Sequence, residues 1–132
     1  MYLRFVVQGH VPQCRAEPGL FRATWRVEEH AGGLFSWVAS EVEGELAWFN
    51  RHLAIPRTFA RRFGRHGERG GVCWFRDTAR EHIARARYFV WLLSEVGLPV
   101  REIRMQAPGP ILWEDDHQIV ALAGRDVPKV FR

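Results

Sequence analysis

The segment Val72–Gln106 constrains the fold of this chain more than any other part of the sequence. It begins with the apolar run Val72–Phe75, continues with a helical pattern at about 78–96, and ends with a strand pattern at 100–106. Gly97 follows the helical pattern at the position where helices commonly stop. A strand, a helix and a strand in this order predict a βαβ unit with two parallel strands, which should cross over with right-handed geometry.

Two helices of the chain carry clear start signals and apolar stripes. Asp77 or Thr78 is predicted to cap the helix inside the βαβ unit, with Glu81 completing a capping box after Thr78. Ser40 and Glu43 form the same pattern at the start of an earlier helix. The core-facing residues are predicted at helical spacing in the two segments: Val42, Leu46, Phe49 and Leu53, then Ala79, His82, Ile83, Ala86, Phe89, Val90, Leu93 and Val96.

The remaining elements are shorter. Alternating apolar residues predict a strand at 2–8, and a weaker pattern predicts a short helix at about 18–30. Near the end of the chain, 111–114 and 118–123 are predicted to pair as a hairpin around the turn at 115–117.

These elements predict an α+β fold rather than a doubly wound one, because the last three strands follow one another without helices between them. We expect one mixed sheet of about five strands, made of the βαβ unit, the N-terminal strand and the C-terminal hairpin, with about three helices packed on it. A chain of 132 residues is expected to form a single domain over 1–132 and to bury roughly two thirds of its unfolded surface.

Targeting, membrane and cofactor signals are missing from the sequence. Met1–Val7 leads directly into a strand pattern and does not resemble a signal peptide, and no apolar run approaches the roughly 20 residues that span a bilayer. Cys14 and Cys73 provide no disulfide framework and no zinc spacing. The acidic turn Glu114–His117 matches no metal-binding loop. We therefore expect a cytoplasmic protein with no membrane association, no metal and no cofactor.

Positive charge is distributed unevenly along the chain. The net charge is +4, and Lys129 is the only lysine among 19 basic residues. From Arg51 to Arg87 ten arginines stand against three carboxylates, whereas the rest of the chain holds nine basic and twelve acidic residues. Such an asymmetry predicts a basic face that could meet a nucleic acid, an anionic ligand or a second copy of the protein.

The first candidate site is the junction between the apolar strand and the long helix. A helix N-terminus presents unpaired N–H groups that favour an anion. Arg76 and Arg80 would supply guanidinium groups, Thr78 a hydroxyl, and His82 a ligand-binding donor or a catalytic acid/base. The alternative is structural: Thr78 caps the helix, the arginines are solvated, and His82 bonds a nearby carbonyl at the edge of the core.

The second candidate site is a basic stretch that includes two phenylalanines, Phe59 and Phe63. Arginines can neutralise phosphates and aromatic rings can stack on bases, so the stretch is a candidate nucleic-acid interface. The alternative is a solvated basic loop, because no known nucleic-acid-binding motif accompanies it. The arginines of this stretch are Arg57, Arg61, Arg62, Arg65 and Arg69.

Several aromatic side chains lie off the predicted apolar stripes. Tyr88, Trp91 and Leu92 fall outside the main stripe of the long helix, and Trp48 falls outside that of the earlier helix, with His52 on the same flank. Either other elements cover both sides of these helices, or an apolar patch remains for a partner. A homo-oligomer is the simplest arrangement that would cover such a patch.

Three functions stay open at this point. The leading hypothesis is a small non-enzymatic binding module whose basic face meets an anionic partner. The second is an enzyme that acts on a small anionic substrate, with Arg76 and Arg80 as clamps and His82 as acid/base; it requires His82 to be reachable from a concave pocket. The third is a nucleic-acid-binding accessory protein that uses the Arg57–Arg69 stretch.

Overall fold

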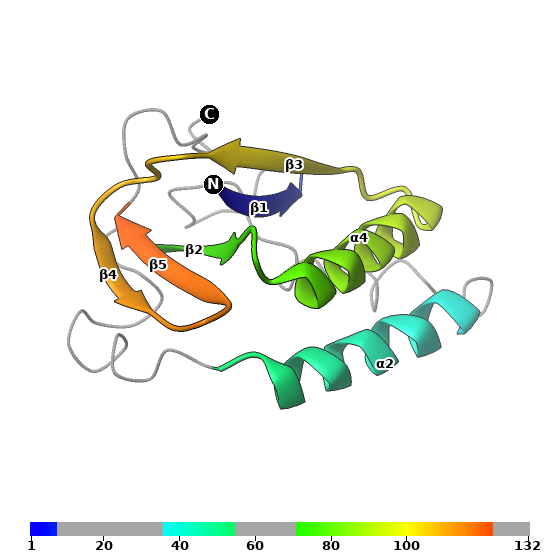
Figure 1. Cartoon of the computed structure of the whole chain (residues 1–132). Helices are drawn as coiled ribbons and strands as arrows, with labels where there is room; N and C mark the ends of the chain where they lie inside the picture. The colour runs from blue at the N-terminus through cyan, green and yellow to red at the C-terminus, as the bar shows by residue number, and fades with distance from the viewer. Residues whose placement is uncertain (8–35, 55–70, 123–132) are drawn as a thin grey trace.

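The computed structural model describes residues 1–7, 36–54 and 71–122, which are called the described residues below. They form two helices and five strands (Figure 1). In chain order the elements are β1 (Tyr2–Val7), α2 (Ser36–His52), β2 (Gly71–Arg76), α4 (Arg80–Glu95), β3 (Val100–Met105), β4 (Ile111–Glu114) and β5 (Gln118–Leu122).

The five strands form one sheet in the order β3-β1-β2-β5-β4. The α+β class and the number of strands agree with the sequence prediction, but the predicted mixed sheet is wrong, because every neighbouring pair is antiparallel. β2 and β3 both run antiparallel to β1, so they are parallel to each other with β1 between them. The βαβ unit is therefore split: Tyr2 of β1 pairs with Arg76 on one side and with Met105 on the other.

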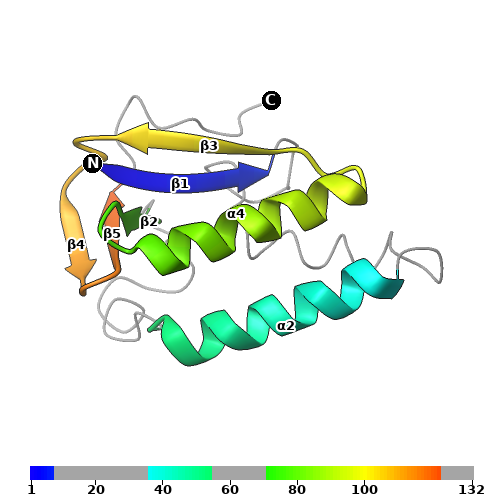
Figure 2. The same cartoon turned by 45° about the vertical axis from the view of Figure 1, so that its right-hand side comes forward.

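Both described helices lie on one face of the sheet, where they run side by side (Figures 1 and 2). The two helices are antiparallel. Glu41 of α2 contacts Tyr88 of α4, whereas Glu45, one turn later in α2, contacts Arg85, about one turn earlier in α4. About three helices were expected, and the described residues contain these two; the helix predicted at about 18–30 lies outside them. Neither α2 nor α4 combines the length and apolar character of a bilayer-spanning helix.

The main core lies between the sheet and the two helices. β1 contributes its alternate residues, and α4 contributes the completely buried Phe89. The buried members of this cluster are Leu3, Phe5, Val7, Val38, Val42, Trp48, Phe49, Phe75, Ile83, Ala86, Phe89, Leu92, Leu93 and Leu98. A second, smaller cluster contains residues that alternate with the first set along β1 and β2, and it includes Trp74, which is 1% exposed. Buried apolar side chains thus occupy both faces of the sheet.

Both predicted capping boxes are wrong. α2 begins at Ser36, so Ser40 lies inside the helix; the additional turn brings the completely buried Val38 into the core. α4 begins at Arg80 with Ala79 as its N-cap and no side-chain cap hydrogen bond. The backbone N–H groups of Ala79 and Arg80 instead bond to the carbonyls of Arg76 and Thr78 in the preceding turn. Thr78 is exposed there.

The predicted stop of the long helix is confirmed. Gly97 has a φ of 79°, a conformation that glycine adopts without the steric cost of a Cβ. The next N–H, on Leu98, reaches back to the carbonyl of Leu93 at 3.0 Å. This arrangement satisfies a carbonyl at the helix end and places Leu98 in the core, 8% exposed.

β1 and β2 pair over only a short stretch. β1 and β3 pair along six residues, whereas β1 and β2 pair only at Tyr2 with Arg76 and at Leu3 with Phe75. Where direct pairing ends, the guanidinium of Arg4 donates to the carbonyl of Cys73 at 3.2 Å. The side chain of Cys73 is exposed, so β2 is not covered on both faces along its whole length.

The contact between Tyr88 and Glu41 across the helix pair predicts a pH-dependent property. The Tyr88 hydroxyl donates to Glu41 Oε2 at 2.9 Å. This hydrogen bond raises the pKa of Tyr88, with smaller contributions from desolvation and from the charges of Glu41 and Glu45. A raised tyrosine pKa stabilises the fold at lower pH, and this contribution is lost as the pH rises through the pKa of the folded protein.

Replacing Glu41 with Gln should therefore lower the pKa of Tyr88 toward the usual value of about 10. Tyrosinate absorbance in a Tyr2→Phe background measures this pKa, because Tyr2 and Tyr88 are the two tyrosines of the chain. Glu43→Gln, an exposed carboxylate on the same helix, is the matched control and should leave the titration unchanged. An equal shift in both variants would contradict a direct Tyr88–Glu41 interaction.

Candidate functional site

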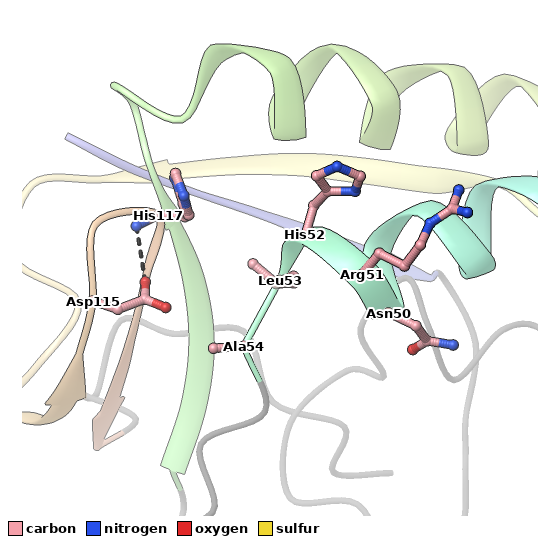
Figure 3. A pocket seen from close by; sticks show the side chains of 7 residues that line it. All are labelled: Asn50, Arg51, His52, Leu53, Ala54, Asp115 and His117. Carbon is pink, nitrogen blue, oxygen red and sulfur yellow. Dashed lines mark hydrogen bonds between the residues drawn. The ribbon is translucent and has the colours of Figure 1, made fainter.

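A pocket of about 470 Å³ lies where the C-terminal end of α2 approaches the turn between β4 and β5 (Figure 3). Five of its lining residues come from the last turn of α2 and the residues after it, and two come from the β4–β5 turn. They are Asn50, Arg51, His52, Leu53, Ala54, Asp115 and His117. The pocket therefore depends on contacts that hold the end of α2 against the rest of the fold.

Two buried side chains make those contacts. His82, on the first turn of α4, donates from Nε2 to the carbonyl of His52 at 2.8 Å. Gln118, at the start of β5, donates from its side-chain amide to the carbonyl of Ala54. The exposed fractions of His82 and Gln118 are 6% and 4%. Carbonyls at a helix C-terminus have no partner within the helix, so these two donors satisfy groups that would otherwise be left unpaired.

The imidazole of His52 has a defined orientation. Its Nδ1 lies 2.8 Å from the carbonyl oxygen of Trp48, and its ring stacks on the Trp48 ring with centroids 4.4 Å apart. Because a carbonyl can only accept, Nδ1 must carry the proton of this hydrogen bond. In the neutral ring Nε2 is then the unprotonated nitrogen and is able to accept a proton or a hydrogen bond.

His117 stands across the pocket from His52 and contacts His82 behind it. The rings of His82 and His117 stack with centroids 4.3 Å apart. Figure 3 shows the rings of His52 and His117 on the side of the pocket that faces α4. His82 also meets Trp48 edge to face at 5.0 Å. His82 is therefore a buried residue one layer behind the pocket, joined to His52 through its carbonyl and to His117 through its ring.

Charged groups occupy opposite sides of the pocket (Figure 3). Arg51 is exposed and makes no ion pair or hydrogen bond within the described residues. Asp115 lies on the turn across the pocket, and its Oδ1 accepts the backbone N–H groups of His117 and Gln118 at 2.8 Å each. Asp115 thus shapes the turn, which is the role that Asp commonly has at such positions.

The four residues of the predicted strand–helix site have different surroundings in the structure. Arg76 donates to the carbonyl of Asp115 at 2.8 Å and to the carboxylate of Glu114 at 2.6 Å, which fixes the β4–β5 turn. Thr78 and Arg80 are exposed at the start of α4, and His82 is buried between the helices. No contact among the described residues joins these four side chains, and their role in ligand binding stays a prediction.

The predicted nucleic-acid site falls in a part of the chain that the structure does not describe. All five of its arginines, Arg57, Arg61, Arg62, Arg65 and Arg69, lie outside the described residues. At the acidic turn, Glu114 and Asp115 bind Arg76 and backbone groups as described above. Within residues 1–7, 36–54 and 71–122, no group of three or more His, Cys, Asp or Glu side chains has the arrangement of a metal site.

The sequence interpretation missed the pocket, although one of its residues carried a signal. His52 follows Trp48 by four residues, the spacing that brings two side chains of a helix together, and the two rings do stack. Arg51 carried no signal that separates it from the other arginines. His117 was noted only as part of the acidic turn, because its contact with His82 joins residues far apart in the sequence.

Comparisons with protein-family models, with curated proteins and with solved structures found no match to this chain, so the geometry of its own residues is the basis for inferring its function.

Proposed function

We propose that this protein is a small binding module that holds an anionic group, such as a phosphate or a carboxylate, in the pocket between α2 and the β4–β5 turn. One observation supports this most strongly: the pocket combines two imidazoles with a guanidinium, that of Arg51, which has no carboxylate partner among the described residues. Asn50 also lines the pocket. These side chains are donors that suit the oxygens of an anion.

The position of His52 suits such a ligand. Its Nδ1–H is held by the carbonyl of Trp48, so a protonated ring would direct its second N–H, on Nε2, away from that carbonyl. Stacking on Trp48 limits rotation of the ring. Arg51 is the next residue toward the N-terminus, and its guanidinium can approach the same anion with two N–H groups. A ring that is already oriented loses less conformational freedom on binding.

The charges of the described residues favour a small anionic group over a long polyanion. The described residues hold eight arginines and ten aspartates and glutamates, so this part of the protein is not a basic surface as a whole. Arg76, Arg85, Arg87 and Arg104 are paired with carboxylates. Arg51 and Arg80 are the two whose side chains make no ion pair or hydrogen bond with another described residue. Of these two, Arg51 lines a pocket.

The proposal predicts that Arg51→Gln weakens the binding of inorganic phosphate by about tenfold or more, since a charge-assisted hydrogen bond contributes about 1.5–3 kcal/mol. Isothermal titration calorimetry, or amide chemical shifts followed during a phosphate titration, measures the change. Arg80→Gln is the matched control, because Arg80 is also exposed and unpaired within the described residues.

The two variants also separate the pocket from the strand–helix junction. Loss of binding in Arg51→Gln with normal binding in Arg80→Gln assigns the anion to the pocket. The reverse result would assign it to the junction predicted from the sequence and would overturn the pocket proposal. Wild-type protein that binds neither phosphate nor acetate would overturn it as well.

An enzyme acting on a small anionic substrate is the second candidate, and His52 is the residue that favours it. The hydrogen bond from Nδ1 to Trp48 leaves Nε2 of the neutral ring as a base beside the pocket. His82, the acid/base predicted from the sequence, is 6% exposed and does not line the pocket. Hydrolysis of a bound phosphate monoester that is lost in His52→Ala would favour the enzyme, whereas recovery of the unchanged ester favours the binding module.

A further inference from the structure

Three exposed aromatic side chains form a row at the N-terminal end of α2, which is the end opposite the pocket. Trp37 and Trp91 are each 48% exposed and Tyr88 is 38% exposed. The ring of Trp91 lies 6.0 Å from that of Trp37 and 5.9 Å from that of Tyr88, centroid to centroid. Trp37, Tyr88 and Trp91 are called the aromatic row below. Exposed aromatic side chains in mutual contact are typical of surfaces that meet a partner.

A carboxylate lies at the same place. Glu41 accepts the hydroxyl hydrogen bond of Tyr88 and is itself exposed. Within the described residues no arginine contacts Glu41 or the aromatic row. The row is therefore an aromatic surface with a negative charge beside it.

One turn further along α2, the two helices again bring an aromatic ring and a carboxylate together, and there an arginine lies between them. The guanidinium of Arg85 lies 4.6 Å from the ring centre of Trp48 and 3.2 Å from Glu45 Oε1. Glu45 follows Glu41 by four residues on α2, and Arg85 precedes Tyr88 by three on α4. An indole, a carboxylate and a guanidinium thus form one layer, and the neighbouring layer has the aromatic rings and the carboxylate but no described cation.

We infer that the aromatic row with Glu41 takes an arginine side chain from a second copy of this chain, so that the protein associates with itself through this surface. Arginine suits the position better than lysine, because its planar guanidinium stacks on aromatic rings while it bonds a carboxylate. Tryptophan, tyrosine and arginine are also the residues that contribute most to protein–protein interfaces.

The charges of the chain support a second copy as the partner. The described residues, which carry the aromatic row, hold eight basic and ten acidic residues. The rest of the sequence holds eleven basic and five acidic residues, including the five arginines of the Arg57–Arg69 stretch. Each copy therefore offers both an acidic aromatic surface and an excess of arginine. Two copies related by a two-fold axis could make this contact twice.

Sedimentation equilibrium of the full chain over a range of concentrations tests this inference. The wild-type protein should dimerise, and Trp91→Ala and Glu41→Gln should each weaken dimerisation by about tenfold, as expected for loss of a cation–π contact or of its charged partner. Glu41→Gln keeps an acceptor for Tyr88 and removes only the charge. Ile111→Ala is the matched control, because Ile111 is an apolar side chain of similar exposure, 46%, on β4.

A combined Arg61→Gln, Arg62→Gln and Arg65→Gln variant tests the source of the cation and should weaken dimerisation at least as much. Circular dichroism confirms that each variant is folded. A wild-type chain that stays monomeric at every concentration overturns the inference. A dimer that Trp91→Ala leaves unchanged overturns it as well. The inference also fails if Trp91→Ala weakens the dimer while either Glu41→Gln or the arginine variant leaves it unchanged. Phosphate is proposed to bind at the pocket, at the other end of α2, so a failure of the phosphate-binding proposal would leave this dimerisation test unaffected.

Discussion

Replacing Phe89 with alanine should lower the free energy of unfolding by about 3–5 kcal/mol. Phe89 is completely buried on α4, in the cluster where both helices meet the sheet. Truncating a ring at such a position removes its transfer free energy and leaves a cavity that the neighbours fill only in part. Since domains of this size have total stabilities of about 5–15 kcal/mol, the variant should lose a large part of its stability.

Urea unfolding followed by tryptophan fluorescence and circular dichroism measures this loss. Ile111→Ala is again the control, because a side chain that is 46% exposed should contribute much less, about 1 kcal/mol or below. A loss in Phe89→Ala that is no larger than in Ile111→Ala would contradict the position of Phe89 at the centre of the core.

Replacing His82 with alanine should cost about 2–4 kcal/mol of stability and should also weaken phosphate binding. His82 is buried, donates to the carbonyl of His52 and stacks on His117. Its loss leaves that carbonyl without its donor and removes a ring that contacts Trp48. Because His52 and His117 line opposite sides of the pocket, both sides lose their common support.

His82→Phe separates the two contributions. A phenyl ring keeps most of the packing against Trp48 and His117 but cannot donate to His52, so the variant should lose about 1–3 kcal/mol, the cost of an unsatisfied buried carbonyl. Denaturant unfolding and a phosphate titration of the same samples measure both effects. A His82→Phe protein as stable as the wild type would show that the hydrogen bond to His52 contributes nothing.

The parts of the fold that depend on local pattern could be predicted from the sequence. The alternation in β1, the Gly97 stop and the hairpin of β4 and β5 each depend on residues within one element or one turn, and all three were predicted. The helix stripe also placed His82 correctly among buried residues. Its role as a support of the α2 end could not be predicted, because its partner lies 30 residues away.

The parts that depend on non-local pairing could not be predicted. Nothing in the pattern of β1 indicates that it separates β2 from β3, and so the sheet was expected to be mixed rather than antiparallel. The starts of the two helices were misplaced for a related reason: burial of Val38 extends α2, and a backbone turn replaces the Thr78 cap of α4. The pocket brings together His52 and His117, which only the completed fold places near each other.

The position of β1 between β2 and β3 has a consequence for how the chain folds. Tyr2 pairs with Arg76 on one side and with Met105 on the other, so β1 cannot complete its pairing until residues this far along the chain have been synthesised. Pairings so distant in sequence carry a large loop-closure entropy and slow the search for the native state. During that interval the apolar residues Leu3, Phe5 and Val7 lack the covering they have in the finished protein. Newly synthesised chains, in which these residues are uncovered, are therefore the form of the protein most prone to aggregate.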